Sequence, residues 1–175
     1  MTAIYKRELK TFFTTVTGWL FIAVHICLAG LYFFAINLLS GYSNVGQSFS
    51  SILFLLLLST PILSMRMLAE ERKQKTDQLI LTSPVSIGGI VAGKYLAMAT
   101  VFTLPVAVMA LFPLILSRYG TVPMGESYTA LLAYYLFGLT CLAIGLFISS
   151  ITESQIIAAV LSFALLFVGY MLSLI

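Results

Sequence analysis

Residues 128–151 read YTALLAYYLFGLTCLAIGLFISSI and contain no Asp, Glu, Lys or Arg. A helix needs roughly 20 apolar residues to cross the hydrocarbon core of a bilayer, which is about 30 Å thick. The apolar character is continuous and lacks the alternation of a membrane strand, which argues against a β-barrel. Because lipid offers no hydrogen-bond partner to a bare backbone, this stretch is predicted to be a transmembrane helix.

The composition extends this prediction to the whole chain. Hydrophobic residues make up 61% of the 175 residues and charged residues only 9%. A soluble domain is nearer half apolar and a quarter charged, so these few charges could not cover a soluble core. The net charge is +3, and the basic residues lie near the ends of apolar runs instead of forming a stripe. Nothing therefore points to nucleic acid, and we expect an integral membrane protein.

Five segments have the length and apolarity of a membrane span, so the fold class is predicted to be an all-α integral membrane protein with about five transmembrane helices. We treat residues 1–175 as a single transmembrane domain. The predicted spans cover about 18–39, 49–68, 87–116, 128–151 and 155–175. Pro61, Pro105 and Pro113 fall inside two of them and are expected to mark kinks.

Residues 2–17 differ from the spans because their apolar residues recur on one helical face. That face holds Ile4, Tyr5, Leu9, Phe12, Phe13 and Val16. Lys6, Arg7 and Lys10 lie largely off it, which predicts an amphipathic helix at the membrane interface. The chain would then turn into the membrane at Gly18 and Trp19. The alternative is a basic anchor that only fixes topology, and the residues leave both interpretations open.

Basic residues predict the orientation of the spans. They occur in the N-terminal segment and in the second loop, whereas residues 40–51, SGYSNVGQSFSS, carry no charge. Since Lys and Arg favour cytoplasmic loops, the N-terminus and the second loop are predicted to be cytoplasmic, with the C-terminus outside.

No catalytic or metal-binding pattern is present in the sequence, so the chain is not expected to be an enzyme. The single histidine, His25, lies in the first span and is expected to bond a neighbouring helix instead of a ligand. Cys27 and Cys141 lie in apolar runs with no metal spacing and no evident disulfide partner. Residues 88–94, GGIVAGK, do not form a phosphate-binding loop.

The spans themselves carry little charge. Lys94 and His25 are the candidates for ionisable groups inside them, which argues against a self-sufficient ion-coupled carrier or channel. Tyr134, Tyr135, Gly138 and Gly145 could line an interface between helices or simply pack there.

Charge is concentrated instead in residues 66–86, RMLAEERKQKTDQLILTSPVS, where seven charged side chains fall within the first 12 residues. Arg66 and Glu70, Glu71 and Lys75, and Lys73 and Asp77 have the four-residue spacing of helical ion pairs. Residues 83–84, Ser-Pro, should end this helix, and Ser86 could cap the third span. The segment is either a charged linker that enforces topology or a docking surface for a soluble partner.

These residues carry a resemblance to a known family. Residues 60–86, TPILSMRMLAEERKQKTDQLILTSPVS, follow an amphipathic YKRELKTFF at 5–13, and ISSITESQIIAA at 148–159 precedes the last span. Together they resemble the ABC-2 permeases of ATP-binding-cassette transporters, most closely the branch with gliding-motility-type permeases. The resemblance covers essentially the whole chain.

The resemblance implies a role for each element. The N-terminal helix is similar to the family's elbow helix, and residues 66–86 are similar to the coupling helix, which docks in a cleft of a separate ATPase subunit. The residues implied at the docking surface are Glu70, Glu71, Arg72, Lys73, Lys75, Thr76, Asp77, Leu79 and Leu81. ATP and Mg²⁺ would be bound by that ATPase, with no cofactor in this chain. A second permease chain would complete a homo- or heterodimer in a bacterial plasma membrane.

Two features depart from the family pattern. Lys75 stands where the family carries Gly before the Thr of the connector, and the sequence has five apolar spans where the family has six, so we expect it to lack the sixth. Family members move lipids, polysaccharides, peptides and drugs, and the low charge of these spans suits export of an amphipathic or lipid-like substrate. The alternative function is a membrane scaffold or sensor that docks a cytoplasmic partner without transporting anything.

Overall fold

The computed structural model describes residues 2–69 and 87–172, and within these ranges the regular elements are helices, with no strand. The all-α prediction is therefore confirmed. In chain order the helices are α1 (Thr2–Thr14), α2 (Val16–Phe33), the π-helix η1 (Phe34–Leu39), α3 (Gly46–Ser64), α6 (Ile87–Met109), α7 (Phe112–Leu116), α8 (Met124–Ile151) and α9 (Gln155–Leu172).

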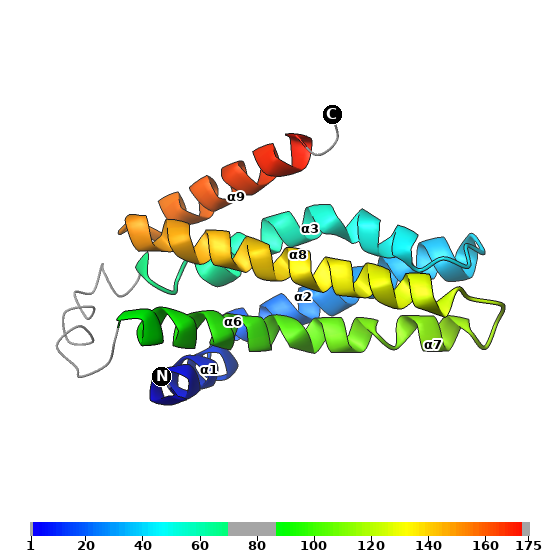
Figure 1. Ribbon diagram of the computed structural model, residues 1–175, viewed down its shortest axis with the longest axis horizontal. Coiled ribbons are helices and arrows are strands. Elements are labelled where there is room, and N and C mark those ends of the chain that lie inside the picture. The colour runs from blue at the N-terminus through cyan, green and yellow to red at the C-terminus, as the bar shows by residue number, and fades with distance from the viewer. Residues whose placement is uncertain (1, 70–86, 173–175) are drawn as a thin grey trace.

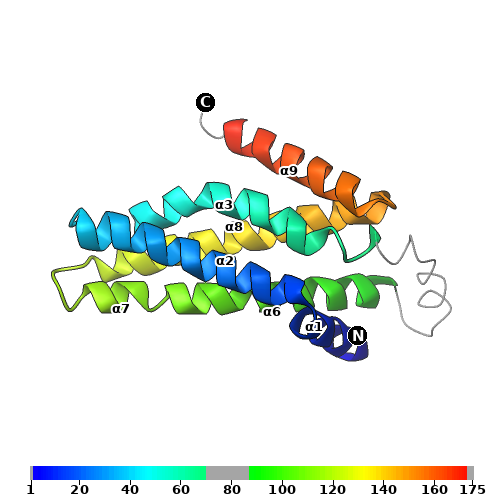
Figure 2. The same ribbon diagram turned by 180° about the vertical axis from the view of Figure 1, so that it is seen from behind.

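Helices α2, α3, α8 and α6 form a four-helix bundle in which each helix packs against the next around the ring (Figure 1). Helix α9 packs on α3 and α8 and diverges from them toward its C-terminal end. Helix α1 lies across one end of the bundle against α6 and α2, as the reverse view also shows (Figure 2). We call this the α1 end, and the opposite end, which carries the loops after η1 and α7, the Asn37 end.

Among the described residues, five segments are long and apolar enough to cross a membrane: Val16–Leu39, Gly46–Ser64, Ile87–Leu116, Met124–Ile151 and Gln155–Leu172. They correspond to the five predicted spans. Their outer faces expose large apolar side chains, as helices surrounded by lipid should. On α9 the buried residues are Ala158, Ser162 and Leu166, a single stripe at four-residue spacing.

The structure moves the boundaries of the second and fourth predicted spans and divides the third. The second span was expected over 49–68, but α3 begins at Gly46 and ends at Ser64, after which Met65 to Leu68 form turns. The third was expected over 87–116 with its prolines marking kinks, and the helix does break at residues 110–111, just before Pro113. The ring of Pro113 would clash with the carbonyl four residues earlier in a continuous helix, so α7 starts afresh with Pro113 in its first turn. The fourth span starts at Met124 instead of 128, and the last three residues of the fifth lie outside the described ranges.

The corner between α1 and α2 also differs from the prediction. The chain turns at Thr15, not at Gly18 and Trp19, and Val16 begins α2 with its side chain exposed instead of extending the apolar face of α1. A Cβ atom on Gly18 would lie 2.3 Å from the Phe12 carbonyl oxygen, so only glycine permits this close approach. The Trp19 indole N–H donates to the Phe13 carbonyl at 2.9 Å and secures the corner.

The middle of the bundle is filled by Phe102, Leu56 and Tyr134, all nearly or fully buried. Helix α8 approaches its neighbours closely through two glycines. A Cβ on Gly138 would lie 2.3 Å from the Phe102 ring, and one on Gly145 would lie 2.2 Å from the Ser64 hydroxyl oxygen. Both glycines are therefore packing residues, one of the two roles that the sequence left open.

Candidate functional site

The nine residues predicted to dock a partner lie outside the described residues, as do the ion pairs that involve them, the Ser-Pro stop and the Ser86 cap. The docking surface therefore stays a prediction. The structure does describe the base from which this connector departs, residues 65–69, and the start of α6 to which it returns at Ile87.

The base of the connector is held by Ser149 of α8, which is fully buried. Its hydroxyl oxygen accepts from the backbone N–H groups of Leu68 and Ala69 at 3.2 and 3.1 Å. The same hydroxyl donates to the Met65 carbonyl at 3.2 Å. One side chain thus bonds three backbone groups in the turns that follow α3, and it fixes where the connector leaves the bundle.

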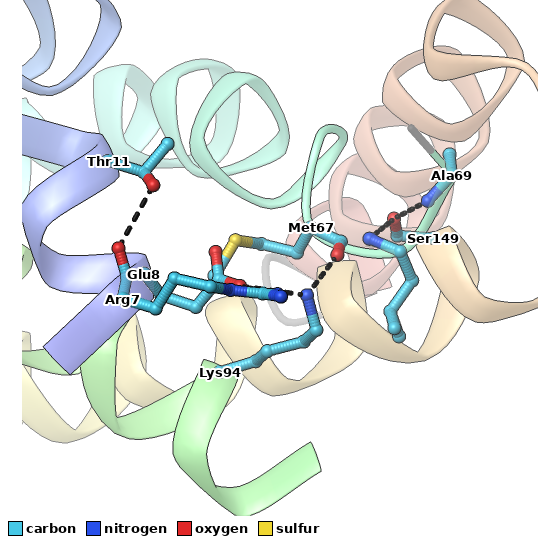
Figure 3. A network of polar contacts seen from close by, with 8 residues as sticks. Arg7, Glu8, Thr11, Met67, Ala69, Lys94 and Ser149 are labelled. Atoms are coloured by element: carbon cyan, nitrogen blue, oxygen red, sulfur yellow. Dashed lines mark hydrogen bonds and ion pairs between the residues drawn. The ribbon is translucent and has the colours of Figure 1, made fainter. Parts of the chain in front are cut away.

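Lys94 of α6 binds the same base from the other side (Figure 3). Its side chain is only 1% exposed. The ammonium Nζ donates to the Met67 carbonyl at 2.8 Å and to Oε1 of Glu8 at 3.3 Å. Lys94 therefore joins α6, the base of the connector and α1 at a single charged group.

Glu8 belongs to α1 and is also buried, at 8% exposure. Its Oε1 atom lies 2.6 Å from Nη2 of Arg7, whose side chain is about half exposed. The carboxylate thus lies between a buried ammonium and a guanidinium at the surface. Burying two charges costs several kcal/mol per ion in desolvation, which close pairing and hydrogen bonding must offset.

A further polar contact joins the base of the connector to α2. Nη1 of Arg66 donates to the Thr17 hydroxyl at 2.6 Å. Helices α1, α2, α6 and α8 therefore all contact residues 65–69 or the Lys94 group that binds them. We call Glu8, Lys94, Met67 and Ser149 the connector junction.

Sequence reasoning identified Lys94 as a charge inside the third span but missed its partner. Glu8 falls three residues after Tyr5 and four before Phe12, so it lies on the apolar face of α1. A carboxylate on the apolar face of an amphipathic helix indicates a buried counter-charge, and this signal could have found Glu8. Ser149 gave no such signal, because a serine in an apolar helix is common.

The prediction for His25 is confirmed. Its Nε2 atom is 2.9 Å from the Tyr134 hydroxyl of α8, and its fully buried ring packs against those of Phe21 and Phe102. The described residues contain no group of three His, Cys, Asp or Glu side chains that could hold a metal ion.

The Asn37 end carries a second buried polar group, which is neutral. The Asn37 amide donates to the carbonyls of Tyr42 and Asn44 at 2.7 and 3.2 Å, and its oxygen accepts from Ser48 at 2.6 Å. A cavity of about 620 Å³ lies beside this loop, between residues 41–43 and 119–122. The residues that line it include no Asp, Glu, Lys or Arg.

The fold and the site together define a class of protein. It is a helical membrane bundle in which the one charged junction among the described residues of the spans holds the base of a connector. Residues 29–175 match the family described as ABC-2 family transporter protein, and the chain therefore belongs to this family. It is an integral membrane protein and a permease of this type. No curated protein matches the chain, and neither does any solved structure.

Proposed function

We propose that this chain is the permease subunit of an ATP-driven exporter, coupled through residues 66–86 to ATP hydrolysis in a separate ATP-binding-cassette subunit. The observation that carries the proposal is the connector junction. A linker that only sets the topology needs no fixed attachment to the helix bundle. A segment that transmits conformational change to the spans does need one. Here Ser149 and Lys94 bind both sides of the connector base.

The orientation rests on the distribution of basic residues. Lys6, Arg7 and Lys10 lie on α1, and Arg66 begins the connector. Helix α1 and residues 65–69, the described base of the connector, both lie at the α1 end of the bundle (Figure 1). The positive-inside rule supports a cytoplasmic α1 end, where a soluble ATPase can reach the connector. By family resemblance the membrane is the bacterial plasma membrane, and a second permease chain completes the translocation path.

The substrate class is inferred from the charges in the spans. In the five spans as the structure describes them, Lys94 and Glu126 are the residues of the Asp, Glu, Lys and Arg types, and each lies near a span end. Lys94 is paired with Glu8. A path for ions or protons usually needs ionisable groups at membrane depth. Their scarcity supports an amphipathic or lipid-like substrate.

The test is co-purification of this chain with an ATP-binding-cassette ATPase encoded beside it. We expect a stable complex, and we expect Glu71→Lys to weaken it while membrane insertion remains normal. The matched control is Glu153→Lys, the same charge reversal at the exposed turn between α8 and α9, at the same end of the bundle. Equal binding by the wild type and both variants would count against docking through the connector. A complex that binds but never uses ATP for transport would favour the scaffold.

A further inference from the structure

The connector junction joins three segments that are far apart in the sequence. Lys94 lies 86 residues from Glu8 and 27 from Met67, yet its ammonium donates to both. Figure 3 shows the lysine side chain reaching from α6 to the carboxylate on one side and to the Met67 carbonyl on the other. Any displacement of Met67 therefore changes the position or the bonding of the group that holds α1.

Attachment of α1 to the bundle does not by itself require this charge pair. Helix α1 already packs through Phe12, which is 7% exposed, with Leu9 and Phe13 against the core. The Tyr5 hydroxyl also lies 3.0 Å from the Thr100 hydroxyl of α6. Apolar residues of similar volume often replace a buried ion pair with no loss of stability. Burying a lysine inside a span costs more free energy than apolar packing at the same place would. Packing alone therefore does not explain why Lys94 is there.

A charge pair differs from apolar packing because it is directional and can exchange partners. Lys94 can move with Met67 only if its bond to Glu8 lengthens or α1 follows. Glu8 has a second cation, Arg7 at 2.6 Å on its solvent side, which can keep the carboxylate paired during such a shift. The structure thus gives the carboxylate two cations, Lys94 toward the connector and Arg7 toward solvent, and contiguous contacts of this kind can carry coupling between distant elements.

We infer that the Glu8–Lys94 pair links connector movement to α1, so that ATP-driven displacement of the connector base repositions the interfacial helix relative to the spans. This inference rests on the proposed function and adds a positioning role for Glu8 and Lys94. Neither residue contacts substrate or nucleotide; both act through Met67 and the connector.

The experiment uses the whole complex of this chain with its ATPase in proteoliposomes. The probe is a bimane fluorophore on Lys6→Cys, an exposed position of α1, in a Cys27→Ser/Cys141→Ser background. The signal is the change in bimane emission when ATP and vanadate trap the ATPase. The test variant is Glu8→Leu/Lys94→Met, which removes both charges together so that neither is left buried alone. Lys94→Arg tests rescue, because a guanidinium can still donate to a carboxylate and a carbonyl.

The matched control is Tyr5→Phe, which removes a different polar contact between α1 and α6, that of the Tyr5 hydroxyl with Thr100, and leaves the charge pair in place. We expect the charge-free variant to assemble and hydrolyse ATP while its bimane response falls about fivefold or more, the scale of a coupling contact. Tyr5→Phe and Lys94→Arg should retain the response. A full response in the charge-free variant would overturn the inference, as would a wild-type complex that hydrolyses ATP with no bimane response. Failure of the wild type to bind the ATPase would instead reject the proposed function, and the inference with it.

Discussion

Each end of the bundle contains a buried side chain that hydrogen-bonds several partners, Lys94 at the α1 end and Asn37 at the other, and the two differ in charge and in reach. At the Asn37 end a neutral amide bonds residues 5, 7 and 11 positions away and closes a local loop. At the α1 end the Lys94 ammonium bonds residues 27 and 86 positions away and joins separate elements. A neutral amide is sufficient to close a local turn. The buried charge of Lys94, which costs free energy to desolvate, occurs where segments distant in the sequence meet.

The two ends can be compared by one measurement. Cys141 is 2% exposed in α8, whereas Cys27 is exposed. In a Cys27→Ser background, the reaction of Cys141 with a thiol reagent therefore reports unfolding of the bundle. Titration with sodium dodecyl sulfate in mixed micelles then gives the free energy of unfolding for each variant.

The largest effect is expected for Glu8→Leu, which removes the carboxylate beside Lys94. Breaking a buried pair from one side costs about 3–5 kcal/mol because a charge remains without its partner. Glu8→Leu/Lys94→Met should recover most of this loss, leaving about 1–2 kcal/mol for the Met67 carbonyl that loses its donor. If the double variant were no more stable than Glu8→Leu, the ion pair would not account for the difference between the ends.

The corresponding change at the other end is Asn37→Leu, with an expected loss of about 2–3 kcal/mol, because buried backbone carbonyls and the Ser48 hydroxyl lose partners. Here a second substitution, Ser48→Ala, should recover little, since the carbonyls of Tyr42 and Asn44 stay unpaired. Recovery as large as that of the Glu8/Lys94 double variant would remove the distinction between the two ends.

Ser149→Ala tests whether the loss of stability depends on the charge or only on the end of the bundle that is changed. It breaks neutral hydrogen bonds at the α1 end, where Lys94 and Glu8 also lie. The hydroxyl accepts from two backbone N–H groups, as a helix cap does, and its loss should cost about 1–2 kcal/mol. Ser150→Ala is the control, because the Ser150 hydroxyl bonds only one turn back, to the Phe147 carbonyl. A loss of stability larger than that of Glu8→Leu would mean that the position of the change in the bundle, not its charge, determines the loss.

The smallest effect is expected for Arg7→Ala. Arg7 contacts the same carboxylate as Lys94, but its side chain is about half exposed, and exposed ion pairs contribute less than about 1 kcal/mol. The free energy of unfolding should therefore hardly change. A loss comparable with that of Glu8→Leu would show that burial is not what distinguishes the two cations.

Sequence alone predicted the helical class and the five spans, because continuous apolarity over about 20 residues has few other structural outcomes. It placed span ends less well. The early end of α3 depends on Ser149 and Lys94, which are distant in the sequence and supply partners to the turn that follows. Similarly, Glu8 is a surface residue by type and becomes a site residue only because α6 brings Lys94 beside it.

The position of α3 has a consequence for biosynthesis. Helix α3 packs against α8, which begins 60 residues after α3 ends (Ser64 to Met124). Because the ribosome synthesises about 5–20 residues per second, several seconds pass between the synthesis of α3 and that of α8. Its inward face includes the hydroxyls of Ser59, Thr60 and Ser64, and each donates to a carbonyl of α3 itself. Helix α3 can therefore remain in lipid with these hydroxyl groups hydrogen-bonded until α8 has been synthesised and packs against it.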